Sequence, residues 1–178
     1  MLPIYEVSLG EMNKISLVEK PAIEEEFMTF NKQEELKLSY DEEKHIVFGP
    51  ALVVDKPIYR RDSNGREFYV IFHKDVIEQL TYNFMKKLNE TANSLFNLEH
   101  NKSTDDVYLV SAFISGNGLN PVGYDDIPEG SLFIALKVQN DDLWNDIKSG
   151  KYNGFSVEVI VNIEPEDELT NLINEIIN

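Results

Sequence analysis

Short apolar runs, each ended by a turn-forming segment, are the feature that most limits what this chain can fold into. Glycine, asparagine, aspartate and proline gather between the runs, as in 115–118 and 125–130. Runs of this length, rich in β-branched and aromatic residues, are typical of strands. They occupy residues 45–54, 67–72, 95–99, 107–114, 132–138 and 155–163. The pattern therefore predicts a β-rich fold whose strands are joined by short turns.

One turn is specific enough to predict a hairpin. Asn64 and Gly65 both tolerate a positive φ, and this pair is the strongest short hairpin signal when it stands between strands. We therefore expect the 67–72 strand to pair with the segment that precedes the turn.

Three stretches have helical patterns. Apolar residues at three-to-four spacing between Asp75 and Leu88 predict one helix, with Asp75 as its cap. Residues 141–148 predict a short second helix that ends at Gly150. Pro165 opens a third, terminal helix with an acidic first turn and an apolar stripe. Helices and strands together predict a β-rich α+β domain.

The length of the chain fits one domain. A chain of 178 residues with 42% hydrophobic content can bury roughly 70% of its unfolded surface. Residues 1–43 are rich in Glu and Lys and are interrupted by Pro3 and Pro21, so we interpret them as an N-terminal arm with a possible strand. Residues 44–178 then form the main domain, which ends in the C-terminal helix.

Charge and cysteine content narrow the function classes. The excess of 32 acidic over 16 basic residues gives a net charge of −16, which repels a phosphate backbone, so we expect no nucleic-acid partner. The absence of cysteine excludes disulfides and thiolate metal sites and permits an intracellular setting. We also find no basic segment leading into a long apolar run, so we expect no export signal and no membrane partner.

The last predicted strand carries the best candidate for chemistry. Strand alternation sends Gly154, Ser156 and Glu158 to one face and the apolar residues between them to the other. A serine hydroxyl needs a base to become a nucleophile, and imidazole is well suited to that near pH 7. A neighbouring strand could insert His100 between Ser156 and Glu158, so that the carboxylate orients the imidazole. This arrangement indicates a serine hydrolase.

Other interpretations of these residues stay open. Serine and glutamate on a strand are commonly surface residues, and His45 and His73 are further candidates for a Ser–His pair. Lys137 or Lys151 could serve as the base of a Ser–Lys dyad. Acidic pairs such as 125–126 invite a metal hypothesis, but they lack the spacing of a calcium loop or of a zinc helix. We therefore expect no metal and no cofactor.

Several segments, taken in order, resemble a known family. The most specific are the histidine that closes a strand, the Trp-x-x-Ile-Lys-x-Gly stretch and the Gly-Phe-Ser-small apolar-Glu segment. Over roughly 44–163, with a weaker similarity near the N-terminus, the chain resembles the prohead maturation proteases of tailed phages, of the XkdF serine protease type. The segments are Ile15-Ser-Leu-Val-Glu-Lys-Pro-Ala22, Asn97-Leu-Glu-His-Asn101, Val107-Tyr-Leu-Val-Ser-Ala-Phe-Ile114, Ile127-Pro-Glu-Gly-Ser131, Leu143-Trp-Asn-Asp-Ile-Lys-Ser-Gly150 and Gly154-Phe-Ser-Val-Glu158.

The resemblance implies a fold and an active site. The fold would be a single closed or nearly closed β-barrel surrounded by helices, like the herpesvirus assemblin proteases. Ser156 would be the nucleophile and His100 the general base of a serine endopeptidase. Related capsid proteases draw a third residue, a histidine or an acid, from well after the serine, but no histidine follows Ser156 here. Glu158 is therefore our first choice for the third member and Glu164 our second.

The resemblance also implies substrates and a setting. The enzyme would cleave scaffold and major capsid precursor proteins, and often itself, inside the procapsid in the host bacterial cytoplasm. The herpesvirus relatives further imply a homodimer. Two alternatives remain: a catalytically inactive protease-like module that binds scaffold or has a structural role in the phage head, and a hydrolase that uses acid pairs without serine chemistry.

Overall fold

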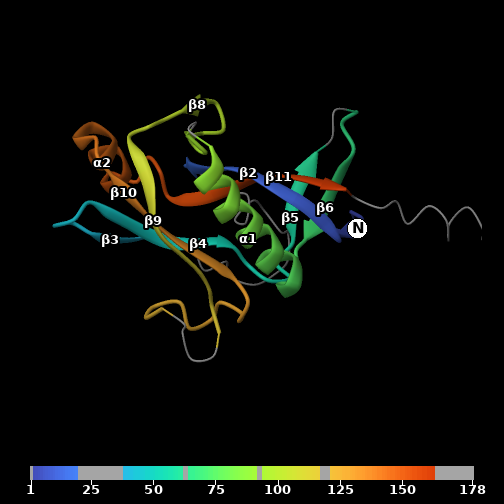
Figure 1. Cartoon of the computed structure of the whole chain (residues 1–178). Helices are drawn as coiled ribbons and strands as arrows, with labels where there is room; N and C mark the ends of the chain where they lie inside the picture. Colours follow the sequence, from blue (N-terminus) through green and yellow to red (C-terminus); the bar gives the residue numbers. More distant parts are fainter. Residues whose placement is uncertain (1, 20–37, 62–63, 92–93, 117–120, 163–178) are drawn as a thin grey trace, which may run out of the picture.

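A computed structural model describes residues 2–19, 38–61, 64–91, 94–116 and 121–162 (Figure 1). Within these ranges the chain forms strands and two helices, α1 (Lys74–Glu90) and α2 (Asp141–Lys148). The strands are β1 (Ile4–Glu6), β2 (Leu9–Val18), β3 (Ser39–Asp41), β4 (Ile46–Leu52), β5 (Ile58–Arg61), β6 (Glu67–Ile71), β7 (Phe96–Leu98), β8 (Lys102–Ser103), β9 (Val107–Ile114), β10 (Leu132–Val138) and β11 (Gly154–Asn162).

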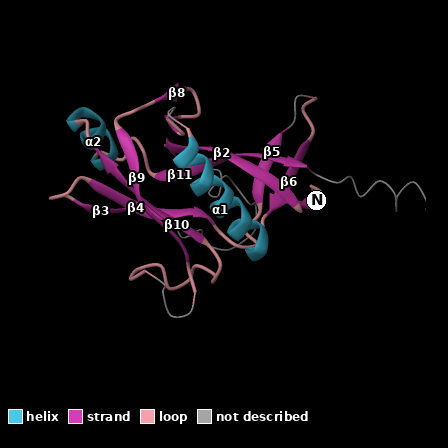
Figure 2. Ribbon diagram, viewed as in Figure 1, coloured by secondary structure: helices cyan, strands magenta, loops and turns pink. Residues whose placement is uncertain are grey.

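The described strands form three sheets (Figure 2). The first has the order β1-β6-β5, the second β3-β4-β10-β9 and the third β11-β2-β7-β8. In the third sheet β2 is an interior strand, antiparallel to β11 and parallel to β7. Helix α1 packs against β2 and buries Val76, Ile77 and Leu80. This third sheet holds the residues that the sequence analysis singled out for chemistry.

The prediction of a single closed or nearly closed barrel surrounded by helices is wrong. The described strands form three separate open sheets, accompanied by two helices. A barrel closes only when every strand has ladder partners on both sides. Strand β11 lies against β4, yet the two belong to different sheets, and Pro50 leaves β4 without one backbone donor. A run of strand-like segments in the sequence does not specify whether their edges meet.

Several predictions of individual strands, turns and helices are confirmed. The strands at 107–114 and 132–138 and the helix at 141–148 are confirmed at the predicted bounds. The hairpin is also confirmed: β5 and β6 pair antiparallel, with Arg61 opposite Glu67 and Gly65 at φ +80°. Gly150 follows α2 at φ +81°, as predicted for the residue after a helix end.

Of the two remaining predictions about helices, one was wrong and the other falls outside the described residues. The N-cap of α1 is His73, and Asp75 lies inside the first turn, so the predicted cap was misplaced by two residues. The predicted C-terminal helix after Pro165 lies outside the described residues.

The first 43 residues contribute more to the fold than the sequence led us to expect. Of these, β2 is a ten-residue strand in the middle of a sheet, and it buries Met12, Ile15 and Leu17. Its polar residues Glu11, Asn13 and Lys14 alternate too irregularly to identify an interior strand. The division of the chain at residue 43 stays a prediction.

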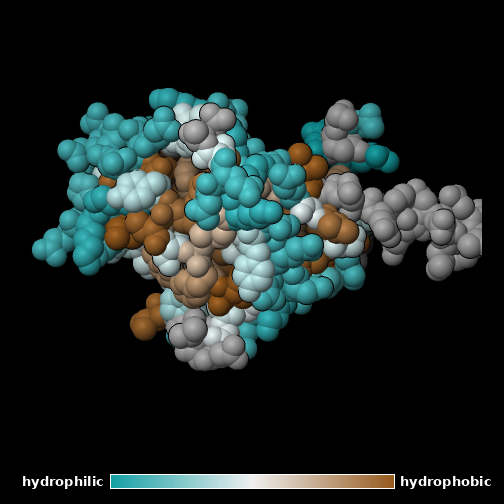
Figure 3. Space-filling model, viewed as in Figure 1, coloured by the Kyte–Doolittle hydropathy of each residue, from teal (hydrophilic) through white to brown (hydrophobic). Residues whose placement is uncertain are grey.

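Apolar side chains of the sheets and of α1 form the core. Phe133 in β10 and Phe155 in β11 are among its largest fully buried members. Each such side chain contributes roughly 1.5–3 kcal/mol relative to an exposed one. Figure 3 shows hydrophilic side chains over much of one face of the molecule, with apolar patches toward its middle. The core holds β11 in place through Phe155 and Val157.

Candidate active site

Ser156 is fixed on β11 by its apolar neighbours. Phe155 and Val157 both belong to the hydrophobic core, and Ser156 lies directly opposite Ser16 in the register with β2. Alternation along the strand turns Ser156 away from Phe155 and toward a cleft that it lines. Ser156 is only 6% exposed. Its hydroxyl is therefore set into the cleft wall and is shielded from bulk water.

His100 is presented by a tight turn between β7 and β8, Leu98–Asn101, which we call the site turn. The amide of Asn101 donates to the carbonyl of Leu98 at 3.1 Å, and Glu99 and His100 have φ of +48° and +56°. Two successive positive φ values describe a type I′ turn, which favours asparagine and glycine. Residues with side chains at such φ values cost about 1–3 kcal/mol each and cluster at functional sites.

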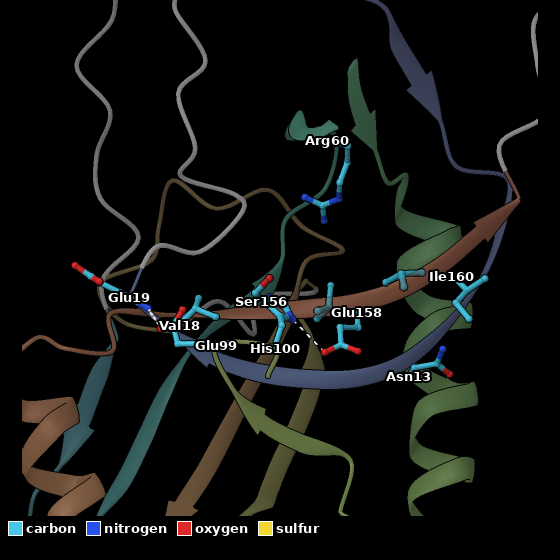
Figure 4. Close-up of a pocket in the computed structure, with 11 residues that line it drawn as sticks. Asn13, Val18, Glu19, Arg60, Glu99, His100, Ser156, Glu158 and Ile160 are labelled. Carbon is cyan, nitrogen blue, oxygen red and sulfur yellow. Dashed lines mark hydrogen bonds and ion pairs between the residues drawn. The ribbon is translucent and has the colours of Figure 1, made fainter. Parts of the chain in front are cut away.

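Two hydrogen bonds of Glu99 hold the strained turn. The Glu99 amide donates to the Leu17 carbonyl at 3.0 Å, and the Glu99 carboxylate accepts from the Glu19 amide at 2.6 Å. These bonds tie the site turn to β2. They place the imidazole of His100 over the cleft that Ser156 also lines (Figure 4).

His100 and Glu158 are in direct contact. His100 Nδ1 lies 3.1 Å from Glu158 Oε1, which is marked by the dashed line between them in Figure 4. In serine hydrolases the orienting carboxylate holds this nitrogen and the serine uses the other one. Within the described part of the chain, His100 Nε2 has no hydrogen-bond partner. Nδ1 is therefore the nitrogen held against the carboxylate, and Nε2 is the one left to take up a proton.

The environment of Glu158 favours its charged form. Burial raises the pKa of this carboxyl, but hydrogen bonds from Asn97 and His100 and the charges of His100 and Lys14 outweigh that effect. The net result is a pKa below the ordinary value. Glu158 is therefore an anion at neutral pH, able to accept a hydrogen bond from imidazole Nδ1 and to stabilise an imidazolium.

Ser156 and His100 share the cleft without being hydrogen-bonded. Both side chains line it, but no hydrogen bond of the Ser156 hydroxyl is found among the residues that the structure describes. Catalytic hydrogen bonds are commonly long or misaligned in the absence of substrate. The arrangement brings the predicted nucleophile, base and acid to one cleft, and their catalytic roles stay a prediction.

Two buried polar residues contact this site and escaped the sequence analysis. Asn97 is 2% exposed and Ser16 is fully buried. Asn97 Nδ2 donates to Glu158 Oε1 at 2.7 Å, Ser16 Oγ donates to Asn97 Oδ1, and Ser16 Oγ lies 2.9 Å from His100 Nδ1. Both residues stand inside segments that carry the family resemblance, but only the strand register reveals that they meet.

The other histidines lie away from Ser156. His45 stacks on Trp144, with ring centroids 4.7 Å apart. His73 Nδ1 lies 2.6 Å from Asp55 and its Nε2 lies 3.3 Å from Glu6. Hydrogen bonds to these two carboxylates raise the pKa of His73. Of the three histidines, His100 is the one that lines the cleft with Ser156.

The lysine alternatives are also placed elsewhere. Lys137 Nζ donates to the Lys44 carbonyl, and Lys151 Nζ lies 2.6 Å from the Asp146 carboxylate. Neither lines the cleft, so the structure does not bring together a Ser–Lys pair. Glu164, the second choice for the third member, lies outside the described residues.

The cleft is large enough for a peptide segment. It is open to solvent, its volume is about 740 Å³, and its lining combines polar and apolar side chains. Arg60 reaches toward it from β5, across from β11, and Glu19 and Glu99 lie at the end opposite Asn13 and Ile160 (Figure 4). Such a mixed lining suits an extended peptide with its backbone polar groups.

Metal-binding clusters and membrane-spanning helices are both absent from the described residues. No group of three or more His, Cys, Asp or Glu side chains that could hold a metal ion occurs among them. No described helix is both long enough and apolar enough to span a membrane.

Comparison with known proteins adds one finding. The sequence model of the family described as "Putative phage serine protease XkdF" matches residues 33–164. No curated protein and no solved structure gives a significant match. The match covers β3 to β11, so it contains Ser156, His100 and Glu158.

Proposed function

The chain belongs to the XkdF family of phage serine proteases, and from that premise we propose that it is a serine endopeptidase of phage head maturation. Ser156 is the nucleophile, His100 the general base and Glu158 the acid that orients it. The observation that carries the proposal is the 3.1 Å contact between His100 Nδ1 and Glu158 in the cleft that Ser156 lines.

The proposed chemistry uses Nε2, the imidazole nitrogen of His100 that does not contact Glu158. When a peptide occupies the cleft, His100 Nε2 takes the proton of the Ser156 hydroxyl as its oxygen attacks the scissile carbonyl. The imidazolium that forms lies against the anionic Glu158 and is stabilised by it. It then gives its proton to the leaving amine, and a water molecule activated by the same nitrogen hydrolyses the acyl-enzyme. A general base is typically worth about 10²–10⁴ in rate.

The proposed substrates are scaffold and major capsid precursor proteins, cleaved inside the procapsid in the host bacterial cytoplasm. The family's phage origin supports this setting, and the open cleft suits an extended segment of a precursor. Self-cleavage is part of the same proposal. Coexpression of the chain with the scaffold and capsid precursors of its phage tests it. Precursors should be shortened by the wild-type chain and left intact by Ser156→Ala.

A catalytically inactive module of the phage head is the second candidate. The observation in its favour is the absence of a hydrogen bond between the described side chains of Ser156 and His100. A fluorophosphonate probe, which reacts with activated serines, separates the two candidates. We expect a single label on Ser156, mapped by mass spectrometry, and a strong decrease in its rate in His100→Ala.

The labelling experiment has a matched control. Ser131 is fully buried just before β10, outside the residues that line the cleft, so Ser131→Ala should label at the wild-type rate if it folds. A folded wild-type chain that takes no label would favour the inactive module over the enzyme.

A further inference from the structure

Four side chains around the site turn form a closed ring of hydrogen bonds. Ser16 is hydrogen-bonded to Asn97, Asn97 to Glu158, Glu158 to His100, and His100 to Ser16. Their strands are adjacent: Ser16 lies opposite Asn97 in the β2–β7 register and opposite Ser156 in the β11–β2 register. A row of polar side chains therefore crosses the sheet toward Ser156, although its members are far apart in the sequence.

The direction of every proton in this ring follows from Glu158. An ionised carboxylate can only accept, so Asn97 must turn its amide nitrogen toward Glu158, at 2.7 Å. That orientation points the Asn97 carbonyl oxygen at Ser16, and this oxygen can also only accept. Ser16 must then donate its single hydroxyl proton to Asn97. Its remaining lone pairs can only accept, and the group within reach is His100 Nδ1 at 2.9 Å.

His100 Nδ1 is left between two acceptors, Ser16 Oγ at 2.9 Å and Glu158 Oε1 at 3.1 Å. Both contacts are satisfied only if Nδ1 carries the proton, which leaves the lone pair of the neutral imidazole on Nε2. Nε2 is the nitrogen that must accept the serine proton. The ring thus selects the tautomer that a general base requires.

We propose that Ser16 and Asn97 are positioning residues that hold His100 as the Nδ1–H tautomer, with Nε2 directed to Ser156. This inference rests on the proposed function and extends it from three residues to five. Ser16 is no second nucleophile, because it is fully buried and its proton is committed to Asn97.

The burial of the two positioning residues fits this role. An unpaired buried hydroxyl or amide costs about 1–3 kcal/mol, so a serine and an asparagine inside a sheet need all their partners. In this ring each polar end of the two side chains has a partner. A polar ring that is fully satisfied fixes one arrangement, whereas apolar residues of similar size would leave His100 with Glu158 alone.

Nitrogen NMR of the wild-type chain tests the tautomer directly. With ¹⁵N-labelled histidine in alkaline solution, where imidazoles are neutral, the ring nitrogens divide into protonated and unprotonated types. His100→Ala identifies the signals of His100 among those of His45 and His73. We expect a protonated Nδ1 and an unprotonated Nε2 for His100. A protonated Nε2 in the wild-type chain would overturn the proposal without the need for any variant.

A pair of variants tests the role of Ser16. The side chain of Glu158→Gln can turn either its carbonyl or its amide group to His100, and the amide would force the proton onto Nε2. With Ser16 and Asn97 in place, we expect the Asn97 amide to hold the carbonyl there, so the single variant keeps Nδ1–H. Adding Ser16→Ala releases Asn97, and a substantial Nε2–H population should appear. Identical tautomer populations in the single and double variants would contradict a role for Ser16.

Labelling by the fluorophosphonate probe supplies the functional measure. Ser16→Ala should lower the labelling rate of Ser156 by about 10-fold, since one hydrogen bond that positions the imidazole is lost. Ser131→Ala is the matched control, because Ser131 is equally buried and its hydroxyl also makes two hydrogen bonds, to Val54 and to Pro128. An equal decrease in both variants would contradict the proposal by reducing the effect to general stability.

The two proposals can fail separately. A chain that never labels at Ser156, yet holds His100 as Nδ1–H through Ser16, would remove the protease function and with it the catalytic purpose of the ring. A chain that labels at Ser156 while His100 is the Nε2–H tautomer would keep the nucleophile and overturn the positioning role of Ser16 and Asn97.

Discussion

The sheet of β3, β4, β10 and β9 packs aromatic side chains against one another, whereas the buried polar side chains of β2 and β7 adjoin the strained site turn. Phe133 lies in an aromatic cluster with Phe48, Phe113 and Tyr124, with ring centroids 5.3–5.6 Å from its own. Around the site turn, Ser16 and Asn97 are equally buried but rely on hydrogen bonds. We therefore expect substitutions in the first region to act mainly on stability and those in the second mainly on the proposed chemistry.

Substitutions in the two regions should therefore change different properties of the chain. In the aromatic cluster any loss of volume should lower the free energy of unfolding and leave the chemistry of the folded fraction intact. Around the site turn, a substitution can abolish the chemistry with little effect on stability, or raise stability at no gain to the chemistry.

Ser156→Ala should have the largest effect on activity and almost none on stability. Removal of a catalytic serine costs about 10⁶ in kcat where the residues act as a unit. The hydroxyl has no hydrogen-bond partner among the described residues, so its loss should leave the free energy of unfolding unchanged or slightly higher. Precursor cleavage and urea unfolding measure the two effects. Wild-type cleavage by the folded variant would contradict the role of Ser156.

Phe133→Ala should lower stability strongly and leave the activity of the folded fraction almost unchanged. Truncating a fully buried phenylalanine costs about 3–5 kcal/mol of unfolding free energy. The fraction that stays folded should still label at Ser156 at the wild-type rate per folded molecule. Urea unfolding, followed by labelling corrected for the folded fraction, checks both points. A labelling rate that collapses in the folded fraction would mean that the two regions are not separable.

Glu158 should make the free energy of unfolding decrease toward acidic pH. The pKa of Glu158 is lowered in the folded chain, so its contribution is fully present above the unfolded value and is lost as pH falls through the folded value. The acid side of the stability profile should therefore be flatter in Glu158→Gln. Urea unfolding over a series of acidic pH values measures this. An unchanged acid slope would contradict a stabilising role for the charged form.

His73 should make the free energy of unfolding decrease toward alkaline pH, opposite to the effect of Glu158. Its pKa is raised by hydrogen bonds to Asp55 and Glu6, so its contribution is present below the unfolded histidine value and is lost as pH rises through the folded value. His73→Asn should remove this decrease between neutral and alkaline pH. Because His73 lies outside the cleft, the Ser156 labelling rate of the folded variant should be that of the wild type. A changed labelling rate would connect α1 to the chemistry.

Glu99→Asn should have the smallest effect, and it should be stabilising. Asparagine accepts the positive φ of the site turn better than glutamate, which we expect to raise the free energy of unfolding by about 0.5–1 kcal/mol. Part of this gain is offset by loss of the contact between the Glu99 carboxylate and the Glu19 amide. Thermal unfolding measures the difference. Marked destabilisation would show that this contact outweighs the strain.

Local patterns predicted the elements whose signals lie within a few neighbouring residues. The buried run 132–138 and the amphipathic segment 141–148 have strong periodicity and flanking turn residues, and both elements have the predicted bounds. Strand β2 was underestimated because its polar residues hide an interior strand. Closure of a barrel was wrongly predicted because it depends on the relative tilt of whole sheets, which no local pattern encodes.

The candidate site could likewise be predicted only in part from the sequence. Ser156, His100 and Glu158 could be selected from residue type and motif, and the structure brings all three to one cleft. Ser16 and Asn97 could not, because serine and asparagine are ordinary residues until the register of β2 with β7 and β11 places them beside His100. Their contribution depends on contacts between residues more than 80 positions apart.

The central claim is that Ser156 and His100 act as one unit, and a crystal structure of the chain after reaction with a fluorophosphonate tests it most directly. We expect phosphorus bonded to Ser156 Oγ, with His100 Nε2 within about 2.6–3.2 Å of that oxygen and Nδ1 still against Glu158. Phosphorus on another side chain, or a His100 ring turned away from a labelled Ser156, would contradict the account.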